Sequence, residues 1–376
     1  TLGADNGLGV ATIMAILEST DIPHPALEAL FTIDEETGMT GAMGLKAGVL
    51  QGDILLNLDT EEDDEIGVGC AGGVDITATR TYSKEKVAKG KTAFKLTVNG
   101  LQGGHSGMDI IKGLGNANKF MNRFLLDGFE NYGLQIAEIN GGGLRNAIPR
   151  ESIAVFCIDE IHTEAFKADI AEFTETLKEE YKTLEPNLTV TLEAQELPET
   201  VMNLGVQEGL LKALQAAWNG VYRMSPDIEG LVETSNNVAR VNVKDGNIEV
   251  LCLTRSSVES SRTDLANTIR SVFELIGCEV ELSGEYPGWK PNMDSPILKV
   301  LVEKYTNLNN EAPHVAACHA GLECGILGQN YPEMDMISFG PTIRGAHSPD
   351  ERASITSVQK FWVFVQEILK DIPVKN

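Results

Sequence analysis

Several short apolar segments of the sequence end in acidic or other polar residues, and this pattern most constrains the fold. ALEALFTIDEE ends at Glu35 and Glu36, DILLNLD ends at Asp59, and DMISFGP precedes His347. A short apolar run with a helical pattern on either side is typical of a buried parallel strand. We expect a further strand of this kind before Asp5. The alternation favours a doubly wound, mostly parallel α/β sheet, whose ligands bind beyond the carboxyl ends of the strands.

Apolar residues at helical spacing predict two helices beside this sheet. The first follows Asp5 and the second ends the chain, and the residues that define them are Leu8, Ile13, Ile16 and Leu17, and Ile355, Val358, Phe361, Val365 and Leu369.

The middle of the chain has a different texture, with alternating strands such as TAFKLTV, SIAVFCID and NIEVLCLT separated by amphipathic helices. A strand, helix and strand occur twice, first from ESIAVFCIDE to LTVTLEAQ and then from GNIEVLCLTR to CEVELSGE. This repetition predicts an inserted α+β domain of two similar lobes. We therefore expect a catalytic domain formed by residues 1–71 and 288–376, interrupted by the inserted domain at 72–287.

Charge and cysteine usage exclude several classes of protein. The formal net charge of -25 repels phosphate backbones, so we expect no nucleic-acid partner. No apolar run approaches the roughly 20 residues that cross a bilayer, and the start TLGADNGLGV lacks the pattern of a signal peptide. The six cysteines are scattered and form no CxxC pair, which favours reduced thiols and a cytoplasmic location without a membrane partner.

The acidic residues at the strand ends are the strongest functional signal. Each acid alone also fits a solvated loop position in an acidic protein. Four carboxylates that converge on one crevice would repel one another unless cations neutralised them. Carboxylates combined with the imidazole of His347 suit zinc, manganese or cobalt, whereas ligands that are all oxygen suit calcium or magnesium.

Six further strings make the interpretation specific. The sequence contains TLGADNGLGVA, TIDEETGMTGA, LNLDTEE, GGHSGMDI, GGLRNAIP and HAGLECG, and these are followed by RGAHSPDER before the C-terminal helix. In this order they resemble the motifs of the Xaa-His dipeptidases, also called aminoacyl-histidine dipeptidases. These belong to the wider superfamily of carboxypeptidase G, tripeptidase T and aminoacylase. The resemblance runs from Thr1 to the C-terminal helix.

The resemblance implies a site with two divalent metal ions, for which we expect zinc, with manganese or cobalt as alternatives. Asp5 would bridge both ions, Glu36 and His347 would complete the first ion, and Asp59 would bind the second. Glu35 would be the general base that takes a proton from the attacking water. The family also binds the second ion through the histidine of an HxD motif upstream of the bridging aspartate. Only four residues precede Asp5, so we expect upstream residues and an incomplete second metal site in this chain.

The inserted domain resembles the lid of the same family. His105 would donate to the oxyanion, while Asn146 and Arg255 would hold the free carboxylate of the substrate. Gly321, in HAGLECG, would let backbone amides approach that carboxylate. For His319 the sequence indicates only a structural role.

The function implied is the hydrolysis of small peptides, in particular dipeptides of the Xaa-His type. Two alternatives remain open: a related tripeptidase or amidohydrolase with the same metals, or a catalytically inactive binding module if the upstream histidine is absent. We also expect a homodimer that forms through the lid.

Overall fold

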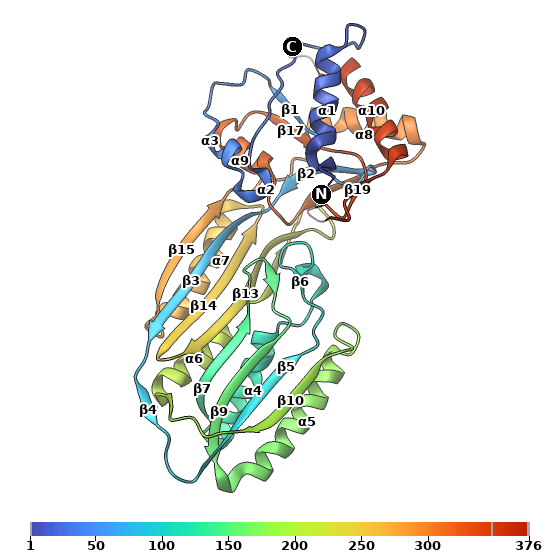
Figure 1. Ribbon diagram of the computed structural model, residues 1–376. Helices are drawn as coiled ribbons and strands as arrows, with labels where there is room; N and C mark the ends of the chain where they lie inside the picture. The colour runs from blue at the N-terminus through green and yellow to red at the C-terminus, as the bar shows by residue number, and fades with distance from the viewer. Residues whose placement is uncertain (1, 347–348, 374–376) are drawn as a thin grey trace. The chain divides into compact units, whose positions relative to one another are not determined.

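The computed structural model describes residues 2–346 and 349–373, without the side chains of Glu36 and Thr37. The chain forms two compact units, each described here by itself (Figure 1). Unit 1 contains Thr1–Gly72, Ser225–Leu231 and Tyr286–Asn376, and unit 2 contains Gly73–Met224 and Val232–Glu285. None of the described helices is long and apolar enough to cross a membrane.

Unit 1 is built on a mixed sheet of four strands in the order β1, β17, β2, β16. The strands are β1 (Ile54–Asn57), β2 (Glu65–Cys70), β16 (His314–Cys318) and β17 (Asp335–Ser338). β1 pairs with β17 in parallel, and so does β16 with β2, whereas β17 and β2 share a single antiparallel pair. The predicted, mostly parallel sheet is confirmed for the segments that end near Asp59 and before the loop of His347.

Helices cover both faces of this sheet, as predicted for a doubly wound fold. The helices are α1 (Ala4–Glu18), α2 (Glu35–Gly38), α3 (Thr40–Gly44), α8 (Pro296–Asn309), α9 (Glu323–Asn330) and α10 (Ile355–Lys370). Ile337 of β17 packs in one core with α1, α8 and α10, while its neighbour Met336 packs in another with α3 and α9. Successive strand residues point to opposite faces, so one strand serves both cores. The predicted helices after Asp5 and at the C-terminus are α1 and α10.

The strand predicted at ALEALFTIDEE is wrong. Residues 26–34 form no strand, and Glu35 instead begins the short helix α2. Phe31 and Ile33 of this segment are exposed. An apolar run becomes a strand only where a neighbour pairs with its backbone, and none of the described strands does so here.

Unit 2 contains one large, antiparallel sheet whose main path runs β10, β5, β9, β7, β13, β14, β3, β15. Its strands are β3 (Gly72–Thr81), β5 (Lys91–Asn99), β7 (Gln135–Gly142), β9 (Ser152–Asp159), β10 (Thr189–Gln195), β13 (Val232–Lys244), β14 (Asn247–Ser256) and β15 (Glu279–Tyr286), with β12 (Gly220–Met224) paired to β13. Two short strand pairs lie outside it: β6 (Gly104–His105) with β8 (Ala147–Ile148), and β4 (Lys84–Lys86) with β11 (Thr200–Met202).

The sheet of unit 2 consists of two halves with the same order of elements. One half reads β5, α4, β7, β9, α5, β10 along the chain, and the other reads β3, α6, β13, β14, α7, β15. In each half the first strand lies between the third and the fourth. The predicted two-lobed α+β architecture is therefore confirmed, and the first half is inserted between β3 and α6 of the second.

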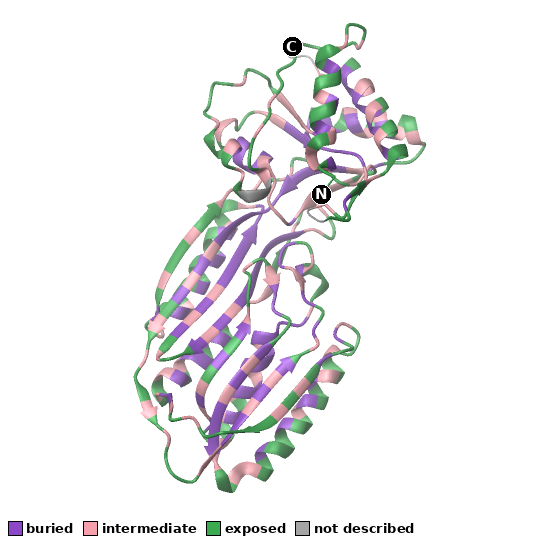
Figure 2. Ribbon diagram, in the orientation of Figure 1, coloured by how far each residue is buried: buried purple, intermediate pink, exposed green. Residues whose placement is uncertain are grey.

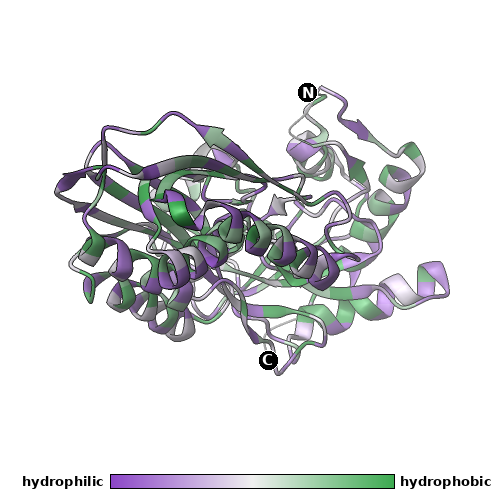
Figure 3. Ribbon diagram, turned by 90° about the horizontal axis from the view of Figure 1, so that it is seen from below, coloured by the Kyte–Doolittle hydropathy of each residue, from purple (hydrophilic) through white to green (hydrophobic). Residues whose placement is uncertain are grey.

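One layer of helices covers this sheet. The helices are α4 (Ala117–Tyr132), α5 (Thr163–Tyr181), α6 (Leu204–Ala216) and α7 (Glu259–Glu274). Figures 1 and 3 show them on one side of the strands. Phe124, Phe166, Leu210 and Phe273 contribute from the four helices to a single core with the strands. Most of β13 is buried (Figure 2), so this strand is enclosed on both faces.

The two halves of unit 2 meet in a ladder of four residue pairs between β7 and β13, from Arg240 with Gly142 to Val243 with Ile139. Gly142 has a φ of 72°, and a Cβ atom there would lie 1.9 Å from the carbonyl oxygen of Ala239. At the preceding residue, Gly141, a Cβ would lie 2.0 Å from Oδ1 of Asn118. Gly142 is therefore required by the close approach of β7 to β13, and Gly141 by the side chain of Asn118 packed against it.

We expect Gly142→Ala to lower the free energy of unfolding of unit 2 by about 2 to 4 kcal/mol, combining a left-handed backbone with a steric clash. Gly143→Ala is the matched control, because its added Cβ meets no atom within 4 Å. Urea unfolding monitored by circular dichroism compares the two variants. Equal stability of both would contradict the role of the close approach.

Candidate active site

Five acidic residues of unit 1 line one cavity of about 790 Å³: Glu28, Glu35, Asp53, Asp59 and Glu323. Glu35 begins α2, and Asp59 follows the end of β1 by two residues. The remaining wall is mainly apolar and includes Val10, Ile13, Leu27, Leu30, Ile54, Leu56, Val365 and Leu369. Glu35 and Asp59, which the sequence predicts to share a crevice, both line this cavity.

Asp5 lies in the first turn of α1, where its backbone departs from helical angles. Glu351 holds this turn, because its carboxylate accepts hydrogen bonds from the backbone N–H of Asp5 (3.0 Å) and of Gly3 (2.7 Å). These donors lower the pKa of Glu351. Asn6, the next residue, lines the cavity that contains Glu35 and Asp59. Glu351 therefore links the end of the RGAHSPDE loop to the turn of Asp5, a contact that sequence reasoning missed.

Two of the predicted metal ligands cannot be placed. The side chain of Glu36 and all of His347 lie outside the described residues. Without them, no group of three or more His, Cys, Asp or Glu side chains that could hold a metal ion is found in the described part. The described donors are carboxylates at the ends of elements of unit 1, and such oxygen ligands fit a divalent cation.

Glu323 is a cavity residue that the sequence did not single out. Burial raises the pKa of its carboxyl group, and a hydrogen bond from Thr32 (2.8 Å to Oε2) opposes that rise. Its second oxygen, Oε1, is buried and accepts no hydrogen bond from the described residues. The sequence signal for Glu323 is its place in HAGLECG, two residues after Gly321. In the structure Glu323 is the first residue of α9.

Gly321 belongs to a loop that unit 1 holds through its carbonyl groups. The backbone N–H of Ala71 donates to the carbonyls of Cys318 and Ala320, at 3.1 and 3.0 Å. A Cβ at Gly321 would lie 3.1 Å from the ring of Tyr286. A larger residue at position 321 would therefore crowd this ring. His319 is buried in the same loop.

In unit 2, the backbone fixes the protonation state of His105. Nδ1 of His105 lies 3.1 Å from the backbone nitrogens of Gly107 and Met108, and both N–H groups donate to it. An Nδ1 that accepts carries no proton, so the proton of the neutral ring is on Nε2. Burial lowers the pKa of His105, and the charge of Arg255 lowers it further. His105 is thus held as a neutral donor through Nε2–H.

Asn146 lies beside His105 because β6 pairs with β8. His105 is opposite Ala147 in this pair, and the carbonyl of Asn146 accepts from the backbone N–H of Ser106 at 2.8 Å. The side chain of Asn146 is exposed. Two predicted substrate-binding residues, which are 41 positions apart in the sequence, are therefore neighbours in unit 2.

Arg255 is buried near the end of β14, with 5% of its surface exposed, and does not lie on the surface. Its two neighbours on the strand are bonded across to β13: Thr254 donates to Asn236, and the hydroxyl groups of Ser256 and Thr234 lie 2.9 Å apart. The charge of Arg255 also acts on Asp75, where it and Arg145 oppose the rise in pKa caused mainly by burial.

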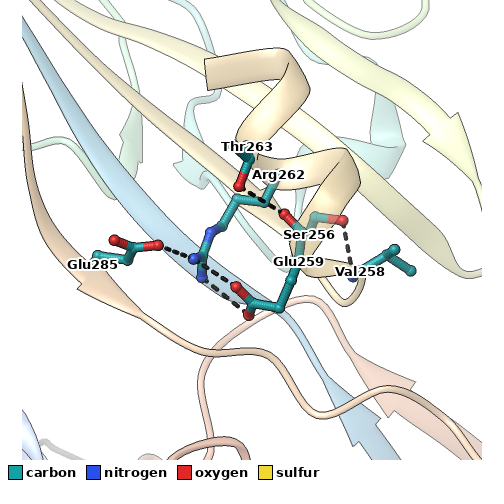
Figure 4. Close-up of polar contacts among 6 residues, drawn as sticks. All are labelled: Ser256, Val258, Glu259, Arg262, Thr263 and Glu285. Carbon is teal, nitrogen blue, oxygen red and sulfur yellow. Dashed lines mark hydrogen bonds and ion pairs between the residues drawn. The ribbon is translucent and has the colours of Figure 1, made fainter. Parts of the chain in front are cut away.

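An ion-pair cluster fixes the helix that follows Arg255 (Figure 4). Arg262 of α7 is 2% exposed and pairs with Glu259 (2.7 Å) and with Glu285 of β15. Ser256 accepts from the backbone N–H of Val258 at 3.0 Å. The start of α7 is therefore tied to β15 through Glu285, and the turn from β14 into α7 is closed by Ser256.

Comparison with known proteins supports one family. The model of the peptidase family M20/M25/M40 matches residues 3–371. The chain is 44% identical over 375 residues to the cytosol non-specific dipeptidase of Escherichia coli (strain K12), covering 100% of this chain and 77% of that protein.

Solved structures agree with this result. The aminoacylhistidine dipeptidase from Vibrio alginolyticus has a TM-score of 0.96 and 44% identity, with 100% of this chain and 77% of that chain covered. The aminopeptidase PepT from Bacillus cereus ATCC 10987 has a TM-score of 0.51 at 12% identity, covering 98% of this chain and 71% of that one. At such low identity the second likeness shows the fold alone.

We expect an NMR titration to give His105 a pKa below 6.5 and an Nε2–H tautomer. Arg255→Gln removes a positive charge that disfavours the imidazolium, so the pKa of His105 should rise. Because the folded-state pKa is lowered, the contribution of His105 to stability is present above pH 6.5 and is lost as the pH falls through the folded value. An unchanged or lower pKa in Arg255→Gln would show that the two side chains do not interact.

Proposed function

The chain belongs to the peptidase family M20/M25/M40, and from this premise we propose that it hydrolyses dipeptides with the help of divalent metal ions. The observation that carries the proposal is 44% identity, over the whole chain, to two proteins that are dipeptidases by name. The cavity that Glu35 and Asp59 share in unit 1 supports it, because hydrolysis needs acid and base groups beside one another.

For the metals, we propose two ions, zinc in the first place, held by Asp5, Glu36, Asp59 and His347. The resemblance of the motifs supports this assignment, and so do the carboxylates of Asp5 and Asp59 at the ends of elements in unit 1. When bound, such ions polarise the substrate carbonyl and lower the pKa of water.

Glu35 is the proposed general base. Its carboxylate accepts a proton from the attacking water and returns the proton to the leaving amine. In unit 2, Nε2–H of His105 is the proposed donor to the oxyanion. Nδ1 accepts two backbone hydrogen bonds, so the proton of the neutral ring is on Nε2, on the other side of the ring. A donor that needs no reorientation loses little free energy when charge develops on the oxygen.

Arg255 and Asn146 are the proposed ligands of the substrate carboxylate, with the backbone at Gly321 as a further contact. A guanidinium group binds a carboxylate through two parallel hydrogen bonds, and a side-chain amide adds a third donor. The anchoring of Thr254 and Ser256 on either side of Arg255 supports a fixed binding geometry. A free C-terminal carboxylate in this position would restrict the enzyme to short peptides.

The two relatives differ in name, one being a cytosol non-specific dipeptidase and the other an aminoacylhistidine dipeptidase. We propose dipeptides as the substrate class, with Xaa-His among them, and product analysis on dipeptides, tripeptides and N-acylated amino acids tests this. The relatives favour neither a tripeptidase or amidohydrolase nor an inactive binding module. A cytoplasmic location is proposed from the cytosolic relative, and a homodimer through unit 2 stays a prediction.

We expect Glu35→Gln to lower kcat for dipeptides by at least about a hundredfold, as is usual when a general base is lost. Metal content, measured by atomic emission on the purified protein, should stay nearly unchanged because Glu35 is not a proposed ligand. Glu333→Gln, an exposed acid of unit 1, serves as the control. Parallel loss of metal and activity in Glu35→Gln would make Glu35 a ligand.

We expect Arg255→Ala to raise KM for free dipeptides roughly ten- to a hundredfold, because a charge-assisted hydrogen bond contributes about 1.5 to 3 kcal/mol. Dipeptides with an amidated C-terminus lack the charge, so the variant should change their turnover little. Arg270→Ala is the control, because Arg270 pairs with Glu274 on the exposed face of α7. The same factor of loss on free and amidated substrates would reassign Arg255 to the structure of unit 2.

A further inference from the structure

We propose that Asn237 is a positioning residue that orients Asn146 for binding of the substrate carboxylate. The inference rests on the proposed function, in which Asn146 binds that carboxylate. It identifies a residue that makes no contact with substrate in this scheme.

Asn237 holds the residues on both sides of Asn146. Its side-chain nitrogen donates to the carbonyl of Arg145 at 3.1 Å and to the carbonyl of Ala147 at 2.8 Å. Only the NH₂ end of an amide can donate to two carbonyl oxygens, so the orientation of this side chain is determined. Both of its N–H groups are used, and Oδ1 faces Nδ2 of Asn116 at 3.4 Å.

The place of Asn237 in the sheet explains why a side chain performs this task. β7 pairs with β13 only from Arg240 onward, and β12 pairs with β13 only up to Asn236. Between these partners none of the described strands forms a backbone ladder with this edge of β13. Side-chain amides replace such a ladder: Asn219 accepts from the N–H of Val238, and Asn116 and Asn118 donate to its carbonyl.

The turn that carries Asn146 is fixed by further contacts. The guanidinium of Arg145 donates to the carbonyls of Ile76 (2.9 Å) and Cys252 (3.2 Å) and pairs with Asp75 at 3.2 Å. Asn237 is 1% exposed, whereas Asn146 is exposed. The buried side chain of Asn237 thus supports the exposed side chain of Asn146. A substrate-binding group that is held in place loses less conformational entropy on binding.

Asn237→Asp removes the two hydrogen bonds to Arg145 and Ala147. It keeps the shape of the side chain but replaces its NH₂ group by an oxygen that faces two carbonyl oxygens. We expect KM for free dipeptides to rise about tenfold, with kcat changed less than about threefold, since one oriented hydrogen bond to a charged group is lost. Asn237→Ser, which keeps one donor, should give a smaller rise and serves if Asn237→Asp fails to fold.

The matched control is Asn122→Asp. Asn122 is equally buried, at 1% exposure, and donates to the carbonyl of Leu211, far from the turn in sequence and on another element. It should lower the thermal midpoint as Asn237→Asp does, yet leave KM unchanged. If both variants lose stability and neither changes KM, Asn237 has only a structural role and the inference is overturned.

A double-mutant cycle decides whether Asn237 acts through Asn146. Asn146→Ala should raise KM by at least as much as Asn237→Asp, and the double variant should be no worse than Asn146→Ala alone. Effects that multiply would overturn the inference, since the two residues would then act independently. A normal KM in Asn146→Ala, with Arg255→Ala still impaired, would instead show that Asn146 does not bind the carboxylate, and the positioning role would end with it.

Discussion

The approach of β7 to β13 is the contact on which the arrangement of unit 2 depends. Two half-sheets of the same design become one sheet through four residue pairs, and the backbones come so close that only glycine fits at Gly142. After this contact β7 must leave the sheet, and the chain turns back through Asn146 to β8. The turn therefore lies over β13, the strand that also pairs with the residues around Arg255. A packing constraint between two halves thus gathers polar groups that the sequence keeps apart.

Much of the fold could be predicted from the sequence, because its signals are local. The apolar runs of β1 and β17 and the helical spacing of α1 and α10 each lie within 16 residues, and each repeated strand, helix and strand of unit 2 lies within 44 residues. The failure at residues 26–34 has the same origin. The run is apolar, but strand formation depends on a partner elsewhere in the chain, and local pattern carries no information about that partner.

Less of the candidate site than of the fold could be predicted from the sequence, because several of its contacts join residues that are far apart in the chain. A carboxylate just after a strand is visible in the sequence, and so Asp59 could be named; Glu35 was named from a strand that the structure does not contain. The contacts of Glu351 with Asp5 and of Asn237 with the turn of Asn146 span 346 and about 90 residues, respectively. Glu351 lies within the string RGAHSPDER and Asn237 within a strand, but neither position indicates its distant contact partner. The tautomer of His105 likewise depends on two backbone N–H groups whose direction only the folded loop determines.

Unit 1 is discontinuous, and this affects how the chain can fold during synthesis. β1 finds its partner β17 only after about 280 further residues, as the bond between Asn57 and Ser338 shows. β13 and β14, in contrast, join through a two-residue turn at Asp245 and Gly246, and all of unit 2 precedes residue 286. Closing a long loop costs more entropy than closing a short one, so contacts between distant segments form slowly. On the ribosome, unit 2 can therefore assemble before β17, the partner of the apolar strand β1, has been synthesised. During that interval β1 is a natural target for chaperones.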